Sequence, residues 1–85
     1  MNSIFPSGKI KTTWDLGDMI RKARKSQGAT QAEFAALCGV GVRFISDLEN
    51  GKQTVRLGKV LQVVQCLGLE MSVLPRRGYG DGPAK

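Results

Sequence analysis

The sequence predicts an all-α domain of four to five short helices, followed by one short strand near the C-terminus. Apolar residues recur at the i, i+3, i+4 and i+7 spacing of amphipathic helices, and this spacing changes to alternation at residues 69–74. Capping residues and glycines separate the helical patterns. We expect three parts: an arm over residues 1–12, a helical domain over 13–74, and a glycine-rich, disordered tail over 75–85.

The first helical pattern begins after Thr13, which we expect to cap the helix. Asp15 then lies in the first turn, where a negative charge interacts favourably with the helix dipole. Gly28 is expected to end the helix. The inner stripe of this helix consists of Leu16, Ile20, Ala23 and Gln27.

Residues 30–51 predict two short helices joined by a tight turn that contains glycine. Thr30 and Glu33 have the S/T-x-x-E spacing of a capping box, in which each side chain binds the other residue's backbone N–H. Gly39 can adopt the left-handed conformation that ends helices. The inner stripe of the second helix consists of Val40, Phe44, Ile45 and Leu48. This layout is that of a helix-turn-helix, which predicts binding to double-stranded DNA.

A fourth helix over residues 57–67 and a strand over residues 69–74 complete the pattern. Leu57, Val60, Leu61, Val64 and Leu67 fit the helical stripe, and Val63 falls off it. A lone strand leaves backbone groups unpaired, so we expect it to pair antiparallel with the same strand of a second molecule. Pairing with residues 9–11 and an extended surface tail remain alternatives. The expected dimer interface consists of Val63, Leu69, Met71, Val73 and Leu74.

Composition excludes several classes of protein. The 85 residues contain two cysteines and no histidine. Cys38 and Cys66 lie inside apolar helical patterns, so we expect small buried hydrophobic residues rather than a disulfide. No metal, cofactor or catalytic set is expected, because there is no Cys-x-x-Cys motif, glycine-rich phosphate loop or paired-carboxylate pocket. Without an apolar run near 18 residues or a signal peptide, we expect a cytoplasmic protein.

A small core leaves dimerisation as the expected source of additional stability, since a chain of this size buries only about 60–65% of its unfolded surface. The net charge is +6, and no acidic block balances the basic residues. A solvated basic surface is the plain interpretation of that charge. Combined with a helix-turn-helix pattern, it indicates neutralisation of DNA phosphates.

The second helix of such a motif enters the major groove with its N-terminal residues at the base edges. The expected base-reading residues are Gly41, Val42, Arg43, Ser46 and Asp47. Arg43 is the foremost candidate, because a guanidinium can contact guanine O6 and N7; an ordinary exposed arginine is the alternative. Asp47 can accept from cytosine N4, bind a neighbouring arginine, or act against wrong sequences. Phe44 shares a face with Leu48 and is expected to pack in the core.

Phosphate contacts are expected to flank the reading helix. They come from the N-terminus of the preceding helix, from the loop after the reading helix and from the N-terminal arm. The residues are Thr30, Gln31, Asn50, Lys52, Gln53, Thr54, Lys9 and Lys11. These contacts fix register and supply salt-dependent affinity.

The run from residue 16 to residue 74 resembles the Xre/Cro/CI-type helix-turn-helix family. Residues 43–57 and 60–70 are similar to HipB-type antitoxins, small repressors encoded beside HipA-type kinase toxins. The resemblance implies a lambda-repressor-like all-α DNA-binding domain whose short C-terminal strand pairs between subunits. It implies a homodimer that binds palindromic operators, represses its operon, and binds and neutralises a HipA-like serine/threonine kinase. It also implies a structural ion pair between Arg24 and Glu49.

Two other functions fit the same residues. One is a stand-alone or phage-type Xre repressor without a toxin partner. The other is a helix-turn-helix that makes only protein contacts, although the basic outward face with Arg43 and Lys52 argues against it. If a kinase partner exists, we expect it to dock on the first or fourth helix or on the tail, where Arg76, Arg77 and Tyr79 lie.

Overall fold

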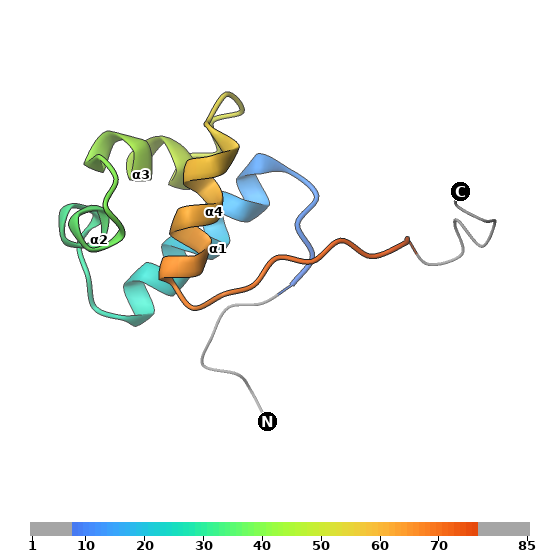
Figure 1. Ribbon diagram of the computed structural model, residues 1–85, viewed down its shortest axis with the longest axis horizontal. Coiled ribbons are helices and arrows are strands. Elements are labelled where there is room, and N and C mark those ends of the chain that lie inside the picture. Colours follow the sequence, from blue (N-terminus) through green and yellow to red (C-terminus); the bar gives the residue numbers. More distant parts are fainter. Residues whose placement is uncertain (1–7, 77–85) are drawn as a thin grey trace.

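Four helices pack around one core in the computed structural model, which describes residues 8–76 (Figure 1). Their bounds are Thr13–Ser26 for α1, Gln31–Cys38 for α2, Val42–Glu49 for α3 and Leu57–Cys66 for α4. Helix α3 packs against both α1 and α2, and α2 also packs against α4. The predicted all-α class and the helix-turn-helix pair, α2 and α3, are confirmed. None of the helices in residues 8–76 has the length and apolar character needed to cross a membrane.

The cap of α1 is Thr12, so the predicted cap, Thr13, is wrong by one residue. Thr12 Oγ1 accepts a hydrogen bond from the Asp15 backbone N–H (3.1 Å), and Asp15 Oδ2 accepts one from the Thr12 N–H (3.1 Å). This reciprocal box requires a spacing of three residues, which Thr12 has and Thr13 lacks. Instead, Thr13 Oγ1 donates to the Gly51 carbonyl oxygen (2.7 Å) and joins α1 to the loop after α3.

The predicted start and end of α2 are confirmed. Thr30 Oγ1 accepts from the Glu33 N–H (3.1 Å), and Glu33 Oε1 accepts from the Thr30 N–H (2.9 Å). Gly39 ends the helix with a φ of 75°, a left-handed conformation that is easy only for glycine. The chain then turns through Val40 and Gly41 into α3.

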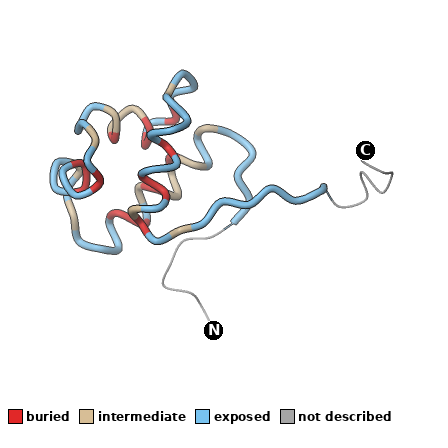
Figure 2. The backbone as a smooth tube through the Cα atoms, in the orientation of Figure 1, coloured by how far each residue is buried: buried red, intermediate tan, exposed pale blue. Residues whose placement is uncertain are grey.

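The core is made by the inner faces of all four helices (red in Figure 2). Its largest fully buried side chains are Phe34, Ile20, Ile45 and Val63. At the crossing of α1 and α3, a Cβ on Gly17 would collide with the Leu48 carbonyl oxygen and lie 2.9 Å from that of Glu49. The close approach of the two helices therefore depends on a glycine at this position.

Helix α4 turns a different face to the core from the predicted one. Val63 is 0% exposed, whereas Leu57 and Leu61 are 67% and 38% exposed. The prediction that Val63 contacts a dimer partner is therefore wrong, as is the inward placement of Leu57 and Leu61. The spacing rule fits two faces of this helix, and packing selects one of them. The selected face consists of Val60, Val63, Val64 and Leu67.

Cys38 and Cys66 form a disulfide, which corrects the expectation of two unpaired thiols. The expected burial holds for Cys38, which is 6% exposed, and Cys66 is half-buried. Each cysteine is the last residue of its helix, and the packing of α2 against α4 brings their Cα atoms within 5.6 Å. That distance suits a disulfide. The sequence separation of 28 residues gave no sign of this proximity.

Residues 69–76 leave α4 as an arm that extends from the helical body (orange in Figure 1). Over this part of the described chain the arm is neither helix nor strand, and it forms no strand ladder with residues 9–11. Val73 and Leu74 are 97% and 78% exposed. Pairing of the arm between two chains stays a prediction. The expectations for residues 1–7, and for Arg77 and Tyr79 of the tail, lie outside the described residues.

Candidate nucleic-acid interface

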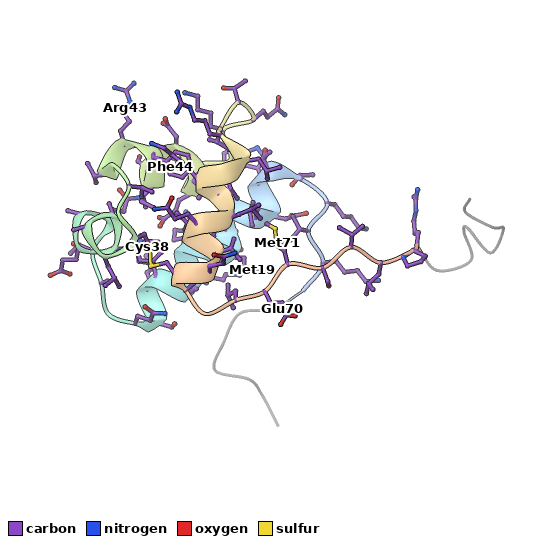
Figure 3. The ribbon with its side chains drawn as sticks, in the orientation of Figure 1. Met19, Cys38, Arg43, Phe44, Glu70 and Met71 are labelled. Carbon is purple, nitrogen blue, oxygen red and sulfur yellow. A yellow bond between two sulfur atoms is a disulfide. The ribbon has the colours of Figure 1, made fainter. Side chains whose placement is uncertain are left out.

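The N-terminal end of α3 is open to solvent. Val42 is 50% exposed, and Arg43 is exposed and points away from the helical body in Figure 3. Ser46 and Asp47, one turn further along, are half-buried. Gly41 is the N-cap and makes no side-chain capping bond, which leaves the first N–H groups of α3 without a side-chain cap. The structure therefore places the five predicted base-reading residues on one helix, from its N-cap Gly41 to Asp47.

Phe44 turns toward the core, as expected. Its ring is half-buried and packs against the core cluster. The Lys59 Nζ atom, from the first turn of α4, lies 5.9 Å from the ring centroid. A cation–π contact of this kind adds about 0.5–1 kcal/mol at an exposed site. It also holds a basic side chain of α4 beside the reading helix, a placement that sequence reasoning missed.

Asp47 and Lys52 meet across the turn that follows α3. The Lys52 Nζ atom lies 3.4 Å from Asp47 Oδ2, and the Lys52 N–H donates to the Asp47 carbonyl oxygen (3.0 Å). The partner of Asp47 is therefore a lysine and not the expected arginine. Exposed pairs such as this one contribute little to stability, about 0–1 kcal/mol. Their effect is local, because the Lys52 ammonium partly neutralises a carboxylate beside the reading face.

The loop after α3 is held against α1. Gly51 has a φ of 77°, and a Cβ on it would lie 2.7 Å from Cδ2 of the Trp14 ring. The indole thus covers the Gly51 backbone, while Thr13 binds its carbonyl oxygen. The exposed residues of this loop are Asn50, Lys52, Gln53 and Thr54. The start of α1 therefore orients the predicted phosphate-binding loop, a contact that sequence reasoning missed.

At the start of α2 the two predicted phosphate ligands have different surroundings. Thr30 is exposed, and its hydroxyl caps the helix. Gln31 is half-buried, and its Nε2 donates to Glu49 Oε1 (3.0 Å). The Gln31 side chain therefore has a structural contact at the end of α3. Lys9 and Lys11 are exposed, but Figure 1 places their segment (blue) away from α3, so the structure does not bring them to the reading face.

The ion pair expected between Arg24 and Glu49 is present and buried. Arg24 Nε donates to Glu49 Oε2 (2.7 Å), and its second terminal nitrogen donates to Oε1 (2.9 Å). The guanidinium also donates to the Ala29 carbonyl oxygen (2.8 Å). Burial would raise the pKa of the Glu49 carboxyl, but hydrogen bonds from Arg24 and Gln31 and the nearby positive charges hold that pKa below its ordinary value. The pair ties α1 to the end of the reading helix.

Basic charge remains around α3 after the ion pairs are assigned. On α1, Asp18 pairs with Arg21 (2.8 Å) and Lys22 (2.9 Å). Hydrogen bonds from Lys22 and Arg21 lower the pKa of Asp18. Within residues 8–76 no carboxylate pairs with Arg43, Arg56 or Lys59, which lie on α3 and at the start of α4. This end of the molecule is suited to a polyanion.

The chain belongs to the helix-turn-helix family, whose sequence model matches residues 20–74. An HTH-type transcriptional regulator of Sinorhizobium fredii (strain NBRC 101917 / NGR234), y4mF, is 52% identical over 66 residues, which are 78% of this chain and 87% of that protein. A chain of a HipA-HipB-O2-O3 complex has a TM-score of 0.75 and 27% identity, covering 84% of this chain and 100% of that chain. A HipB-O4 20mer complex gives the same TM-score of 0.75, identity of 27% and coverage of 84% and 100%. The resemblance to Xre-type, HipB-like proteins is thereby confirmed.

Proposed function

We propose that this protein is a sequence-specific transcriptional repressor that binds double-stranded DNA with the N-terminal end of α3. One observation carries the proposal. Ile45 and Leu48 anchor α3 in the core, while Val42 and Arg43 project outward beside exposed basic residues. An anchored helix with side chains projecting from its first turn is suited to the major groove of B-DNA. The similarity to a transcriptional regulator and to HipB supports the same function.

Base reading centres on Arg43. Its exposed guanidinium can donate two parallel hydrogen bonds to guanine O6 and N7, a contact that discriminates by about 1–3 kcal/mol. Val42 can contact a thymine methyl group, and Ser46 can donate to a base or a phosphate. Asp47, neutralised in part by Lys52, can accept a hydrogen bond from cytosine N4. Gly41 lets the DNA approach the first backbone N–H groups of the helix.

Phosphate binding falls to the exposed loop after α3 and to the start of α2. Asn50, Lys52, Gln53 and Thr54 form the first set, and Thr30 with the backbone of Gln31 forms the second. Backbone N–H groups at a helix start carry partial positive charge and bind anions. Lys9 and Lys11 add contacts only if their segment approaches the same duplex.

We infer that two copies pair through the arm after α4. Met71, Val73 and Leu74 are 45%, 97% and 78% exposed, an arrangement that costs hydration free energy in a single chain. Antiparallel pairing of two arms would cover these side chains and satisfy backbone groups, with Leu69 at the root of each arm. Light scattering at micromolar concentration should give twice 9.2 kDa, and a persistent monomer would contradict the dimer. Met71→Pro removes a donor from the ladder and should weaken the dimer.

We further propose that the repressor is the antitoxin of a HipBA-type operon and acts in the cytoplasm by binding and neutralising a HipA-like kinase. The support is the similarity to a chain of the HipA-HipB-O2-O3 complex. We expect the kinase to contact exposed surfaces of α1 or α4.

Copurification of the tagged full-length chain from its native host, with sequencing of the bound DNA, tests both parts. The proposal predicts an enriched inverted repeat upstream of the chain's own gene and a copurifying kinase. An enriched repeat without a kinase would leave a stand-alone repressor. A protein partner without any enriched DNA would contradict sequence-specific repression.

A further inference from the structure

The disulfide between Cys38 and Cys66 joins two points that matter for DNA binding. Cys38 is the last residue of α2, directly before the turn that leads into the reading helix α3. Cys66 is the last residue of α4, the helix that precedes the arm over residues 69–76. Figure 3 shows Cys38 between α2 and α4, beneath Phe44 and Arg43 in that view. One covalent bond therefore links the base of the reading unit to the root of the proposed dimerisation arm.

The same junction has a second, non-covalent link from α4. Gln62 Nε2 donates to the Cys38 carbonyl oxygen (2.7 Å), one turn before Cys66. Val40 N–H donates to the Ala35 carbonyl oxygen (3.0 Å) and closes the end of α2. Breaking the disulfide would leave these hydrogen bonds and the core contacts in place. We therefore expect the reduced chain to adopt the same fold, with α2 and α4 joined by fewer interactions.

Two reduced thiols fit this site without cost in hydrogen bonding. A free cysteine behaves as a small hydrophobic residue when buried, and Cys38 is 6% exposed. Cys66 is half-buried and is the more exposed residue of the pair. Disulfides inside the cytoplasm are rare and are usually redox-sensing when they occur. These properties suit a bond that forms and breaks, not a permanent crosslink.

We propose that Cys38 and Cys66 form a reversible thiol–disulfide switch that sets the stability of the helix-turn-helix and, resting on the proposed function, its occupancy of operator DNA. The oxidant is a low-molecular-weight disulfide of the glutathione type. The Cys66 thiolate attacks one sulfur of that disulfide, which releases one glutathione thiolate and leaves a mixed disulfide on Cys66. The Cys38 thiolate then attacks the Cys66 sulfur and releases the second glutathione. The two protein thiols lose two protons and two electrons, and the glutathione disulfide gains them and becomes two thiols.

The size of the effect follows from the loop that the bond closes. A disulfide stabilises a protein mainly by reducing the conformational entropy of the unfolded chain. This stabilisation grows with the length of the closed loop, and here the two cysteines are 28 residues apart. For a domain of this length, the expected fall in Tm on reduction is about 10 °C or more. A core that is marginal by size makes the folded fraction sensitive to such a change.

The test equilibrates the purified full-length chain in oxidised or reduced glutathione and measures its mass after thiol alkylation and its Tm by circular dichroism. We expect an unalkylated chain, lighter by two hydrogen atoms, under oxidising conditions and a doubly alkylated chain at a cytosolic glutathione ratio. The Tm should fall on reduction and return on reoxidation. Cys38→Ala/Cys66→Ala is the control, and its Tm should not respond to glutathione. If that variant fails to fold, the mass and Tm of the natural chain still decide the question.

Three results would overturn the switch. They are free thiols in oxidised glutathione, a bond that persists at the cytosolic ratio, and equal Tm values for the two states. The link to DNA uses a duplex that the oxidised chain selects from random-sequence DNA. Between the two Tm values, binding to this duplex should disappear on reduction and return on reoxidation. A chain that selects no duplex contradicts the proposed function but leaves the thermal result on the switch intact, so the two failures are distinguishable.

Discussion

The two ends of α3 are built differently. At its C-terminal end, Gly17 of α1 lies against the backbone, and Glu49 is enclosed by Arg24 and Gln31. At its N-terminal end, Arg43 extends into solvent after the uncapped start at Gly41. The bound end fixes the direction of the helix, so the open end can project side chains without losing their position. The contacts that hold α3 and the side chains that it exposes therefore lie at different ends of a helix of only 8 residues.

Removing the Glu49 carboxylate should have the largest effect on the bound end. Breaking a buried ion pair leaves the Arg24 charge without its partner and costs about 3–5 kcal/mol. Glu49→Ala should lower the free energy of unfolding by about that amount in urea denaturation. The exposed pair on α1 provides the control, since Asp18→Asn should change stability little. If both variants lose the same free energy of unfolding, the buried Arg24–Glu49 pair contributes no more than an exposed ion pair.

Acid should weaken the same contact. The native pKa of Glu49 lies below its ordinary value, so its contribution to stability is complete above about pH 4.3 and is lost as the pH falls through the native pKa. Below pH 4.3, approximately, the free energy of unfolding should fall more steeply for the natural chain than for Glu49→Gln. Asp18 titrates in both proteins, so the difference isolates Glu49. Parallel pH profiles would contradict this assignment.

Adding a methyl group at the α1–α3 crossing should have a smaller effect. Gly17→Ala places a Cβ against two backbone carbonyl oxygens, and such overpacking costs about 1–3 kcal/mol. The matched control is Gly58→Ala in α4, where a Cβ meets nothing within 4 Å. That change should instead stabilise the helix by about 0.5–1 kcal/mol. Thermal unfolding of both variants compares the two sites, and a neutral Gly17→Ala would argue against the close approach.

At the open end, Lys52→Ala should leave stability almost unchanged and weaken binding to all DNA sequences alike. A lost phosphate contact reduces the slope of log affinity against log salt by about one. Fluorescence anisotropy over a series of salt concentrations measures that slope. An unchanged slope would show that Lys52 pairs with Asp47 and does not contact DNA phosphates.

The parts that the sequence predicted are those that depend on local spacing. The Thr30–Glu33 box, the turn at Gly39 and the outward position of Arg43 follow from residues three or four apart. The errors arose where local rules allow two answers. Thr12 and Thr13 both suit a cap, and α4 is apolar on the faces of Leu61 and of Val63.

Contacts between distant parts of the chain could not be predicted from the sequence for a different reason. Cys38 and Cys66 meet because α2 packs against α4, and Trp14 covers Gly51 because α1 crosses the end of α3. Neither proximity leaves a pattern in the spacing of residues. The Arg24–Glu49 pair was anticipated only through the resemblance to a family.

Sequence-specific reading by the open end of α3 is tested most directly by Arg43→Ala. Its affinity for a selected operator and for the same operator with one base pair changed is compared with that of the natural chain by anisotropy at fixed salt. The variant should bind the operator more weakly and lose about 1–3 kcal/mol of preference at one position in each half-site, with an unchanged Tm. If the preference for the operator is the same with and without the arginine, Arg43 does not read bases and the assignment of this end of α3 is wrong.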